Sequence, residues 1–345
     1  MPVPVEPARH ALRVMESFGP PHPRTNPYLR LLVDSLPGGA DPDSTEVLYF
    51  SWAGALRGDY DVFHVHWPEV LVRGTSPLRS VVRGMLFGLL LIRLRLSRRA
   101  LVRTLHNEEP HERPNALQRW LLALCDRWTT LWIVMSDAVG PVRHAPEVVI
   151  PHGHYRPWFE DVPLHPAEPG RLLHFGKVRP YKGVEQLLDA FEDLDDPALS
   201  LHVAGEVSDD SLRRRLTAAA ASDPRIRIVD RHLSDGELAE QIHRSELVVL
   251  PFTSVTNSGS TLLALSLDRP VLTPRQPMAV SLAEEVGGDW VRLFDAPLRA
   301  DDVRAALTSI RTRRAASRPD LSVRDWPAIG AAHAAAFSRA RELAR

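Results

Sequence analysis

Several kinds of residue are scarce in this sequence, and each scarcity excludes a structural feature or a class of protein. Cys125 is the only cysteine among 345 residues, so no intrachain disulfide can form, and we expect a cytoplasmic protein. The formal net charge of -1 excludes the overall basic character of many nucleic-acid-binding proteins. The first residues lack the basic and then apolar order of a secretory signal. With 44% hydrophobic and 25% charged residues, the composition is that of a globular protein.

Lysine is also scarce. The chain has 42 lysines and arginines together, but only two are lysines, Lys177 and Lys182. Both lie in residues 174–183, between the apolar pair Leu172-Leu173 and a helical pattern that begins at Val184. A strand, a glycine-bearing turn and a helix N-terminus form an anion site, because the first helical N–H groups lack partners. A compact ammonium suits such a site. An exposed loop with two chance lysines is the alternative.

Acidic residues are absent from residues 70–107, a segment with eight arginines. The apolar run of residues 84–92 inside it is too short to span a bilayer, which needs ~20 apolar residues. We expect residues 79–103 to lie along an anionic membrane surface, with arginines reaching the headgroups. A buried helix with a basic flank is the alternative. The expected location is cytoplasmic, at the inner face of the plasma membrane.

Short apolar segments alternate with helical patterns over the whole chain. The expected strands are residues 11–15, 47–50, 61–67, 100–105, 132–135, 148–150, 171–175, 199–204, 226–229, 247–250 and 270–272. Asn26 and Pro27 have the residue types of a helix cap and a first helical position. This alternation predicts parallel sheets with helices on both faces, and ligands bind beyond the carboxyl ends of such strands. The length suits two domains.

Polar residues gather at two strand ends in the first half. They are His64, His66, Trp67 and Glu69 after the third strand, and His106, Glu108, Glu109, His111 and Glu112 after the fourth. The second group is dense enough to supply an acid or base to an acceptor hydroxyl. A metal site is conceivable, but no spacing fixes one. The alternatives are histidines packed under a helix and a solvated helix N-terminus.

Further candidates follow strands of the second half. They are Gly205 and Glu206, then Arg231 and His232, and then Asn257, Ser258, Gly259 and Ser260. The last group precedes a helical pattern, and small hydroxyl residues with glycine at a helix start make a backbone anion cradle. An ordinary helix cap is the alternative.

The pairs Gly176-Lys177 and Lys182-Gly183, the crossing Pro151-His152-Gly153 and the turn at residues 268–271 resemble motifs of GT-B glycosyltransferases. The nearest resemblance is to bacterial exopolysaccharide and glycolipid enzymes of the glycosyltransferase family 4-like group. It implies an α/β fold of two Rossmann-like, doubly wound parallel-sheet domains facing a cleft. Residues 1–150 would bind the acceptor and residues 151–325 the nucleotide sugar, and a helix over residues 326–345 would pack back on the first domain.

The resemblance also implies a reaction. A sugar moves from a GDP- or UDP-sugar to a hydroxyl of a lipid-linked or saccharide acceptor. Retaining relatives carry two glutamates eight positions apart, but no glutamate stands near residues 255–257 or Leu263 here. We therefore expect an inverting transfer, and the resemblance to the bacterial exopolysaccharide enzymes implies that it needs no metal. The base would come from Glu108, Glu112, His111 or His106.

The remaining roles follow from the same resemblance. The expected acceptor-binding residues are His64, His66, Trp67, Glu69 and Glu109. The expected donor-binding residues are Lys177, Lys182, Gly176, Gly205, Glu206, Arg231, His232, Asn257, Ser258, Gly259 and Ser260. Two alternatives share the fold: an epimerase acting on the nucleotide sugar itself, and a catalytically inactive binding subunit.

Overall fold

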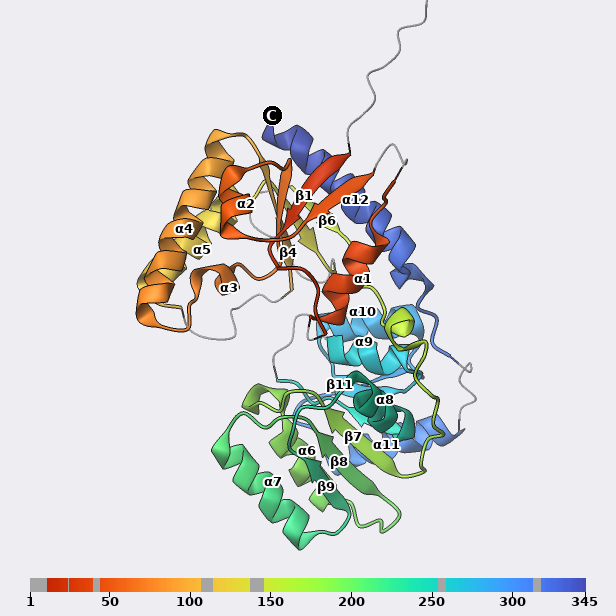
Figure 1. The fold of residues 1–345 in the computed structure, drawn as a ribbon. Coiled ribbons are helices and arrows are strands. Elements are labelled where there is room, and N and C mark those ends of the chain that lie inside the picture. Colours follow the sequence, from red (N-terminus) through yellow and green to blue (C-terminus); the bar gives the residue numbers. More distant parts are fainter. Residues whose placement is uncertain are drawn as a thin grey trace, which may run out of the picture. The chain divides into compact units, whose positions relative to one another are not determined.

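The computed structural model describes residues 11–23, 25–39, 44–106, 114–136, 146–253, 259–312 and 318–345. The chain forms two compact units (Figure 1). The first unit comprises Met1–Gly153 with Val323–Arg345, and the second unit comprises His154–Ser322. Each contains one six-stranded sheet in which all pairs of strands are parallel. The expected α/β class with two doubly wound sheets is confirmed.

The sheet of the first unit has the strand order β2-β1-β3-β4-β5-β6. The strands are β1 (Leu12–Glu16), β2 (Thr45–Leu48), β3 (Val62–Val65), β4 (Ala100–Leu105), β5 (Leu131–Val134) and β6 (Glu147–Val149). The helices are α1 (Pro27–Ser35), α2 (Trp52–Arg57), α3 (Pro68–Val72), α4 (Pro77–Leu96), α5 (Ala116–Trp128) and α12 (Trp326–Ala344). The order of the strands reverses between β1 and β3, so the carboxyl ends of these two strands flank the place where such sheets bind ligands.

The sheet of the second unit has the strand order β12-β11-β10-β7-β8-β9. The strands are β7 (Arg171–Phe175), β8 (Ser200–Ala204), β9 (Ile226–Val229), β10 (Leu247–Val249), β11 (Val271–Pro274) and β12 (Val291–Phe294). The helices are α6 (Val184–Glu192), α7 (Asp210–Ser222), α8 (Asp235–Arg244), α9 (Gly259–Ser266), α10 (Pro277–Val286) and α11 (Ala300–Thr312). The reversal of order here lies between β7 and β10.

The sequence accounts well for the central strands and for several helix starts. β3, β5, β7 and β10 are buried along their whole length, as strands covered by helices on both faces must be. Asn26 caps α1 by accepting a hydrogen bond from Tyr28 N at 3.0 Å, and Pro27 begins the helix, as expected. β12 was not foreseen. It is an edge strand with two half-buried positions, so it lacks a continuous apolar run.

Helix α12 brings the end of the chain back to the first unit, where it packs against α1 and β4 (Figure 1). The two helices approach closely at Gly330, where an added Cβ would lie 1.9 Å from the carbonyl oxygen of Ser35. Only glycine fits there. Among the helices that the structure describes, none combines the length and the hydrophobicity that crossing a bilayer requires.

We expect Gly330→Ala to lower the free energy of unfolding of the first unit by about 1–3 kcal/mol, the usual cost of overpacking. Helical Gly236 in α8 is a matched control, because an added Cβ there meets nothing within 4 Å. Alanine at Gly236 should be neutral or mildly stabilising, since it favours the helix. Thermal unfolding by calorimetry measures both. Equal transition temperatures for the two variants would show that α12 is not seated at this position.

Candidate active site

The glycine turn after β7 lies at the reversal point of the second sheet. Gly176 and Gly183 both have positive φ angles, +94° and +69°, which side chains disfavour. A Cβ at Gly183 would lie 2.0 Å from the carbonyl oxygen of Pro251, which follows β10. Gln186 donates a hydrogen bond to the same oxygen at 2.8 Å. The turn, and with it the start of α6 at Val184, therefore lies against the end of β10.

The two lysines of this turn have different surroundings. Lys182 is enclosed: its Nζ lies 5.2 Å from the centroid of the Phe252 ring and 3.1 Å from where a Cβ of Gly176 would be. Burial, and then repulsion from Arg179, lower the pKa of Lys182 to about 8. Lys177 is half exposed, and its Nζ lies 3.6 Å from Oε2 of Glu206. An enclosed ammonium that has no carboxylate contact among the described residues is suited to an incoming anion, and Lys182 fits that description better.

The backbone beside the turn is equally tight. Gly205 follows β8 with a φ of +146°, and a Cβ there would lie 2.1 Å from the carbonyl oxygen of Gly176. Glu206 extends from the same bend and binds Lys177 as described. Arg231 and His232 follow β9, but the Arg231 guanidinium already forms an ion pair with Glu237 at 2.7 Å. These four predicted donor residues therefore line the carboxyl ends of adjacent strands.

Helix α9 begins beside the glycine turn. Ser260 Oγ lies 3.9 Å from where a Cβ of Gly176 would be, so the start of α9 meets the turn after β7. A Cβ at Gly259 would lie 3.3 Å from the hydroxyl of Tyr155. Asn257 and Ser258, the other two predicted residues of this cradle, lie outside the described residues.

One buried residue beside the cradle was not anticipated as functional. His174 in β7 has no exposed surface, and its Nδ1 lies 3.0 Å from the carbonyl oxygen of Val249. Its Nε2 is buried without a hydrogen-bond partner among the described residues. Burial, and then the charge of Lys182, lower the pKa of His174 to about 4. His174 is therefore neutral and adds no charge to the site.

The first unit has its own polar cluster at the reversal point between β1 and β3. Glu16 ends β1 with no exposed surface, and its carboxylate accepts from two histidines. His64 Nδ1 lies 3.0 Å from Oε1, and His66 Nε2 lies 3.2 Å from Oε2. Nε2 of His64 is 2.8 Å from Oγ1 of Thr104 in β4. Sequence reasoning missed Glu16; its signal was a single acidic residue closing an apolar strand.

His106 joins the cluster from the end of β4. Its Nε2 lies 2.9 Å from Nδ1 of His66. The ring stacks on Trp67 with centroids 4.3 Å apart, and it meets the edge of Tyr28 at 5.2 Å. Tyr28 also contacts the ring of His152 at 4.5 Å. The structure thus joins four of the predicted residues in one continuous set of contacts: His64, His66, Trp67 and His106.

The ionisation of the cluster follows from its burial and hydrogen bonds. Burial would raise the pKa of Glu16, but its interactions with His64 and His66 prevail and lower that pKa to about 2. Burial, and then His64, lower the pKa of His66 to about 4. Burial, and then His66, hold the pKa of His106 well below its usual range. Near neutral pH, Glu16 is an anion and the rings of His66 and His106 are neutral.

The other predicted first-unit residues have different surroundings. His64 is fully buried and both of its ring nitrogens bond to Glu16 or Thr104, which suits a supporting position. Glu69 lies in the first turn of α3 and is half-buried. Four further candidates, Glu108, Glu109, His111 and Glu112, lie outside the described residues.

Glu16, His64 and His66 are also the one group among the described residues whose ligand atoms lie close enough to hold a metal ion, within 4.8 Å of one another. In this structure those atoms are joined to each other by the hydrogen bonds given above. The second ring nitrogen of each histidine is also bonded, to Thr104 or His106.

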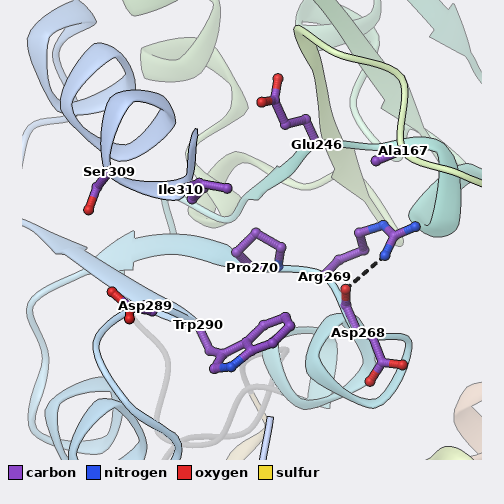
Figure 2. Close-up of a pocket in the computed structure, with 9 residues that line it drawn as sticks. All are labelled: Ala167, Glu246, Asp268, Arg269, Pro270, Asp289, Trp290, Ser309 and Ile310. Carbon is purple, nitrogen blue, oxygen red and sulfur yellow. Dashed lines mark hydrogen bonds between the residues drawn. The ribbon is translucent and has the colours of Figure 1, made fainter. Parts of the chain in front are cut away.

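A cavity of about 200 Å³ lies elsewhere in the second unit, near Pro270, Trp290 and Ile310 (Figure 2). Pro270 immediately precedes β11 and Trp290 immediately precedes β12, so the cavity is at the amino ends of these strands. The glycine turn follows the carboxyl end of β7, and the strands are parallel. The cavity is therefore separate from the cradle.

Three comparisons show which known proteins this chain resembles. Residues 169–309 match the family model described as glycosyl transferases group 1. Two proteins of Xanthomonas campestris pv. campestris, both named GDP-mannose:glycolipid 4-beta-D-mannosyltransferase, are 42% and 41% identical over 337 residues, 96% of this chain and 94% of each relative.

Solved structures share the fold at much lower identity. Anabaena HepE in complex with UDP-glucose has a TM-score of 0.57 at 15% identity, covering 96% of this chain and 98% of that one. Sucrose-phosphate synthase from Thermosynechococcus elongatus has a TM-score of 0.60 at 16% identity, covering 97% and 96%. These likenesses establish the two-sheet fold and nothing finer.

Proposed function

The chain belongs to the group 1 glycosyltransferases, and from this premise we propose that it transfers mannose from GDP-mannose to a hydroxyl of a glycolipid, with inversion at the anomeric carbon and without a metal ion. The observation that carries the proposal is the 42% identity, over nearly the whole chain, to a protein named as a GDP-mannose:glycolipid mannosyltransferase. A fold with two reversal points, each lined by polar residues, supports it.

The donor diphosphate is assigned to the glycine turn of the second unit. Lys182 supplies the enclosed positive charge, and the N–H groups at the starts of α6 and α9 supply hydrogen-bond donors. Gly176, Gly259 and Ser260 have small side chains or none, so they leave room for the diphosphate. Asn257 and Ser258 are predicted from the sequence to be their neighbours. Charge builds up on the diphosphate as the sugar leaves, and fixed donors at this place stabilise that charge.

The rest of the donor is assigned to the neighbouring strand ends. Gly205 and Glu206 are proposed to hold the ribose, and Arg231 and His232 the edge of the base. Lys177 belongs to the rim of this site, because it is half exposed and already close to Glu206. Its contribution to donor binding is therefore expected to be smaller than that of Lys182, since a surface pair gains little.

The acceptor and the base are assigned to the first unit. The proposed acceptor-binding residues are His66, Trp67, Glu69 and Glu109. His64 is proposed to support them. The base comes from the segment that begins at His106 and includes Glu108, His111 and Glu112. It takes the proton of the acceptor hydroxyl as the oxygen attacks the anomeric carbon, and a positioned base of this kind contributes about 10²- to 10⁴-fold in rate.

Metal independence follows from having the lysine and helix N-termini at the diphosphate. We expect transfer by protein dialysed against EDTA to equal transfer by untreated protein. Turnover measured with and without added Mg²⁺, Mn²⁺ or Zn²⁺ checks this. Loss of activity on dialysis, restored by one of these ions, would contradict the proposal and direct attention to Glu16, His64 and His66 as ligands.

A membrane face is proposed on α4, which runs beside α5 (Figure 1). Its outward stripe is apolar, with side chains between 41% and 79% exposed: Leu78, Val81, Val82, Met85, Leu89, Ile92 and Leu96. Val70 on α3, and Leu117 and Trp120 on α5, extend the apolar surface. A patch of this size, centred on a helix whose sequence has no acidic residue, suits an anionic lipid surface, where a glycolipid acceptor would be found.

The arginines of this region divide into two groups. Arg93 donates a hydrogen bond to the carbonyl of Arg57, and the guanidinium of Arg99 lies 5.6 Å from the centroid of the Tyr60 ring, so both stabilise the unit itself. Arg79 and Arg95 are exposed and are the better candidates for headgroup contacts.

We expect the double variant Met85→Glu with Leu89→Glu to be released from anionic vesicles. Each inserted apolar side chain is worth about 1.5–3 kcal/mol, and both positions are exposed, so the fold should survive. Leu164→Glu is the control, because Leu164 is an exposed leucine of the second unit. Co-sedimentation with vesicles measures binding. Equal vesicle binding by the parent and the double variant, or no binding by the parent, would show that this face does not bind membranes.

Incubation with labelled GDP-mannose and a lipid-linked saccharide tests the function as a whole. Mannose should appear in the lipid fraction, and UDP-glucose should be a poorer donor. Conversion of the nucleotide sugar without an acceptor to a different nucleotide sugar would indicate an epimerase. Tight GDP binding, with neither sugar transfer nor slow hydrolysis of the donor, would indicate an inactive binding subunit.

A further inference from the structure

We propose that His174 is a positioning residue for Lys182: its buried Nε2 accepts a hydrogen bond from the ammonium and holds that ammonium in place for the donor diphosphate. The inference rests on the proposed function, because that function assigns the diphosphate to Lys182. The pairing of the two side chains rests independently on their surroundings at the end of β7.

The His174 ring has an acceptor nitrogen without a partner. Its Nδ1 lies 3.0 Å from the carbonyl oxygen of Val249, and a carbonyl can only accept, so Nδ1 carries a proton. Burial keeps the ring neutral, so the lone pair is on Nε2. Nε2 is buried and has no hydrogen bond among the described residues. A buried acceptor left in this way lowers stability, so a donor that reaches it is favoured.

Phe252 brings the ring and the ammonium to the same place. Nζ of Lys182 lies 5.2 Å from the centroid of the Phe252 ring, and the His174 ring meets the same ring edge-on, with centroids 6.4 Å apart. Among the described residues, Lys182 is also the charged group that acts on His174. Val249 fixes the orientation of the imidazole, whereas the ammonium has three donors that can rotate toward it. Lys182 is therefore the donor best placed to reach Nε2.

A neutral partner suits an ammonium that binds phosphate. A carboxylate would compete with the diphosphate, and Glu206 stands in that relation to Lys177, with Oε2 3.6 Å from Nζ. An imidazole lone pair fixes one N–H and leaves the charge and two N–H groups for the ligand. Burial, and then repulsion from Arg179, lower the pKa of Lys182 to about 8, and a hydrogen bond to Nε2 opposes both effects.

Two substitutions separate the two ring nitrogens. In His174→Asn the amide can still donate to Val249 from the place of Nδ1, but it does not reach the place of Nε2. In His174→Gln the amide oxygen reaches the place of Nε2, and the bond to Val249 is lost. We expect His174→Asn to lower the pKa of Lys182 from about 8 to about 6–7, because a hydrogen bond to a charged group is lost. His174→Gln should leave that pKa near 8.

The scarcity of lysine makes this pKa directly measurable. The chain has two lysines, so carbon-13 NMR of protein labelled at lysine Cε gives two signals, and Lys177→Arg assigns them. The control is His243→Asn, a buried histidine in the last turn of α8, which should leave the pKa of Lys182 unchanged. If His174 only joins β7 to β10, the order of the two variants reverses, because His174→Asn keeps the bond to Val249.

Calorimetric titration with GDP connects the pairing to the donor. At pH 8 a lower pKa leaves fewer molecules with a charged Lys182, so His174→Asn should bind GDP about 5- to 50-fold more weakly than the parent. At pH 6 the difference should be about twofold at most, since Lys182 is then largely charged in both proteins. His174→Gln should follow the parent at both pH values.

A second measurement uses the parent protein and stays valid if a variant does not fold. The nitrogen-15 signal of an unprotonated imidazole nitrogen moves when its hydrogen-bond donor is lost. In histidine-labelled parent protein, the Nε2 signal of His174 should therefore move at the same pH as the Cε signal of Lys182. In Lys182→Met the Nε2 signal should be constant over that range.

The outcomes distinguish the pairing from the proposed function. An unchanged pKa of Lys182 in His174→Asn, or an Nε2 signal of His174 that does not follow Lys182, overturns the pairing. A lowered pKa of Lys182 in His174→Asn, in a protein that binds no GDP or binds it equally at pH 6 and pH 8, supports the pairing and overturns the assignment of the diphosphate to Lys182.

Discussion

Lys182→Met is expected to weaken GDP binding by about 10- to 150-fold, the equivalent of a charge-assisted hydrogen bond worth about 1.5–3 kcal/mol. Methionine keeps an apolar stem against Phe252 and removes only the charge. Lys177→Met is the matched control, and it should cost much less because Lys177 is half exposed beside Glu206. Calorimetric titration with GDP measures both. Equal GDP affinities in the two variants and the parent would show that the diphosphate does not bind at this turn.

The pH dependence gives this prediction a second signature. The pKa of Lys182 is about 8 in the folded protein without ligand, so GDP affinity should fall as pH rises above 8, when the ammonium is lost. Stability of the unliganded protein should change in the opposite sense. Between the folded pKa and the higher unfolded one, the unfolded chain binds more protons, so this residue's contribution to stability rises with pH. Both slopes should be absent from Lys182→Met, which has no group to titrate there.

Gly205→Ala is the second large effect, and it should abolish measurable donor binding while destabilising the second unit. A Cβ at this position would lie 2.1 Å from the carbonyl oxygen of Gly176, so the glycine turn itself must move. The positive φ of +146° adds strain of about 1–3 kcal/mol. Urea unfolding and GDP titration measure the two consequences.

Gly287→Ala separates the effect of backbone strain from the effect of a steric clash. Gly287 also has a positive φ, +94°, but an added Cβ there meets nothing within 4 Å. That variant should lose some stability and keep full GDP affinity. Parental GDP affinity in Gly205→Ala would show that the contact between the ends of β7 and β8 does not shape the donor site.

The parallel-sheet architecture could be read from the sequence because its central strands are continuous apolar runs. β4, β7 and β9 have the expected bounds, and the capping of α1 by Asn26 follows from a local pattern of residues. β12 was missed because an edge strand need not be apolar. Local patterns predict local structure, and the parallel arrangement then follows from the alternation of strands and helices.

The candidate site was harder to predict for a physical reason. Glu16 and His64 are 48 positions apart, and only the pairing of β1 with β3 brings them together. Lys177 and Lys182 differ in how deeply they are buried, and the sequence around each lysine does not show this. The roles of Glu108, Glu109, His111 and Glu112, and of Asn257 and Ser258, stay predictions from the sequence.

The anomeric configuration of the product tests the central claim most directly, because a single displacement by an acceptor oxygen inverts the carbon it attacks. With GDP-α-mannose as donor, NMR of the purified glycolipid product should show a β-linked mannose. An α-linked product would contradict the account, since it would require retention and therefore a mechanism without the first-unit base.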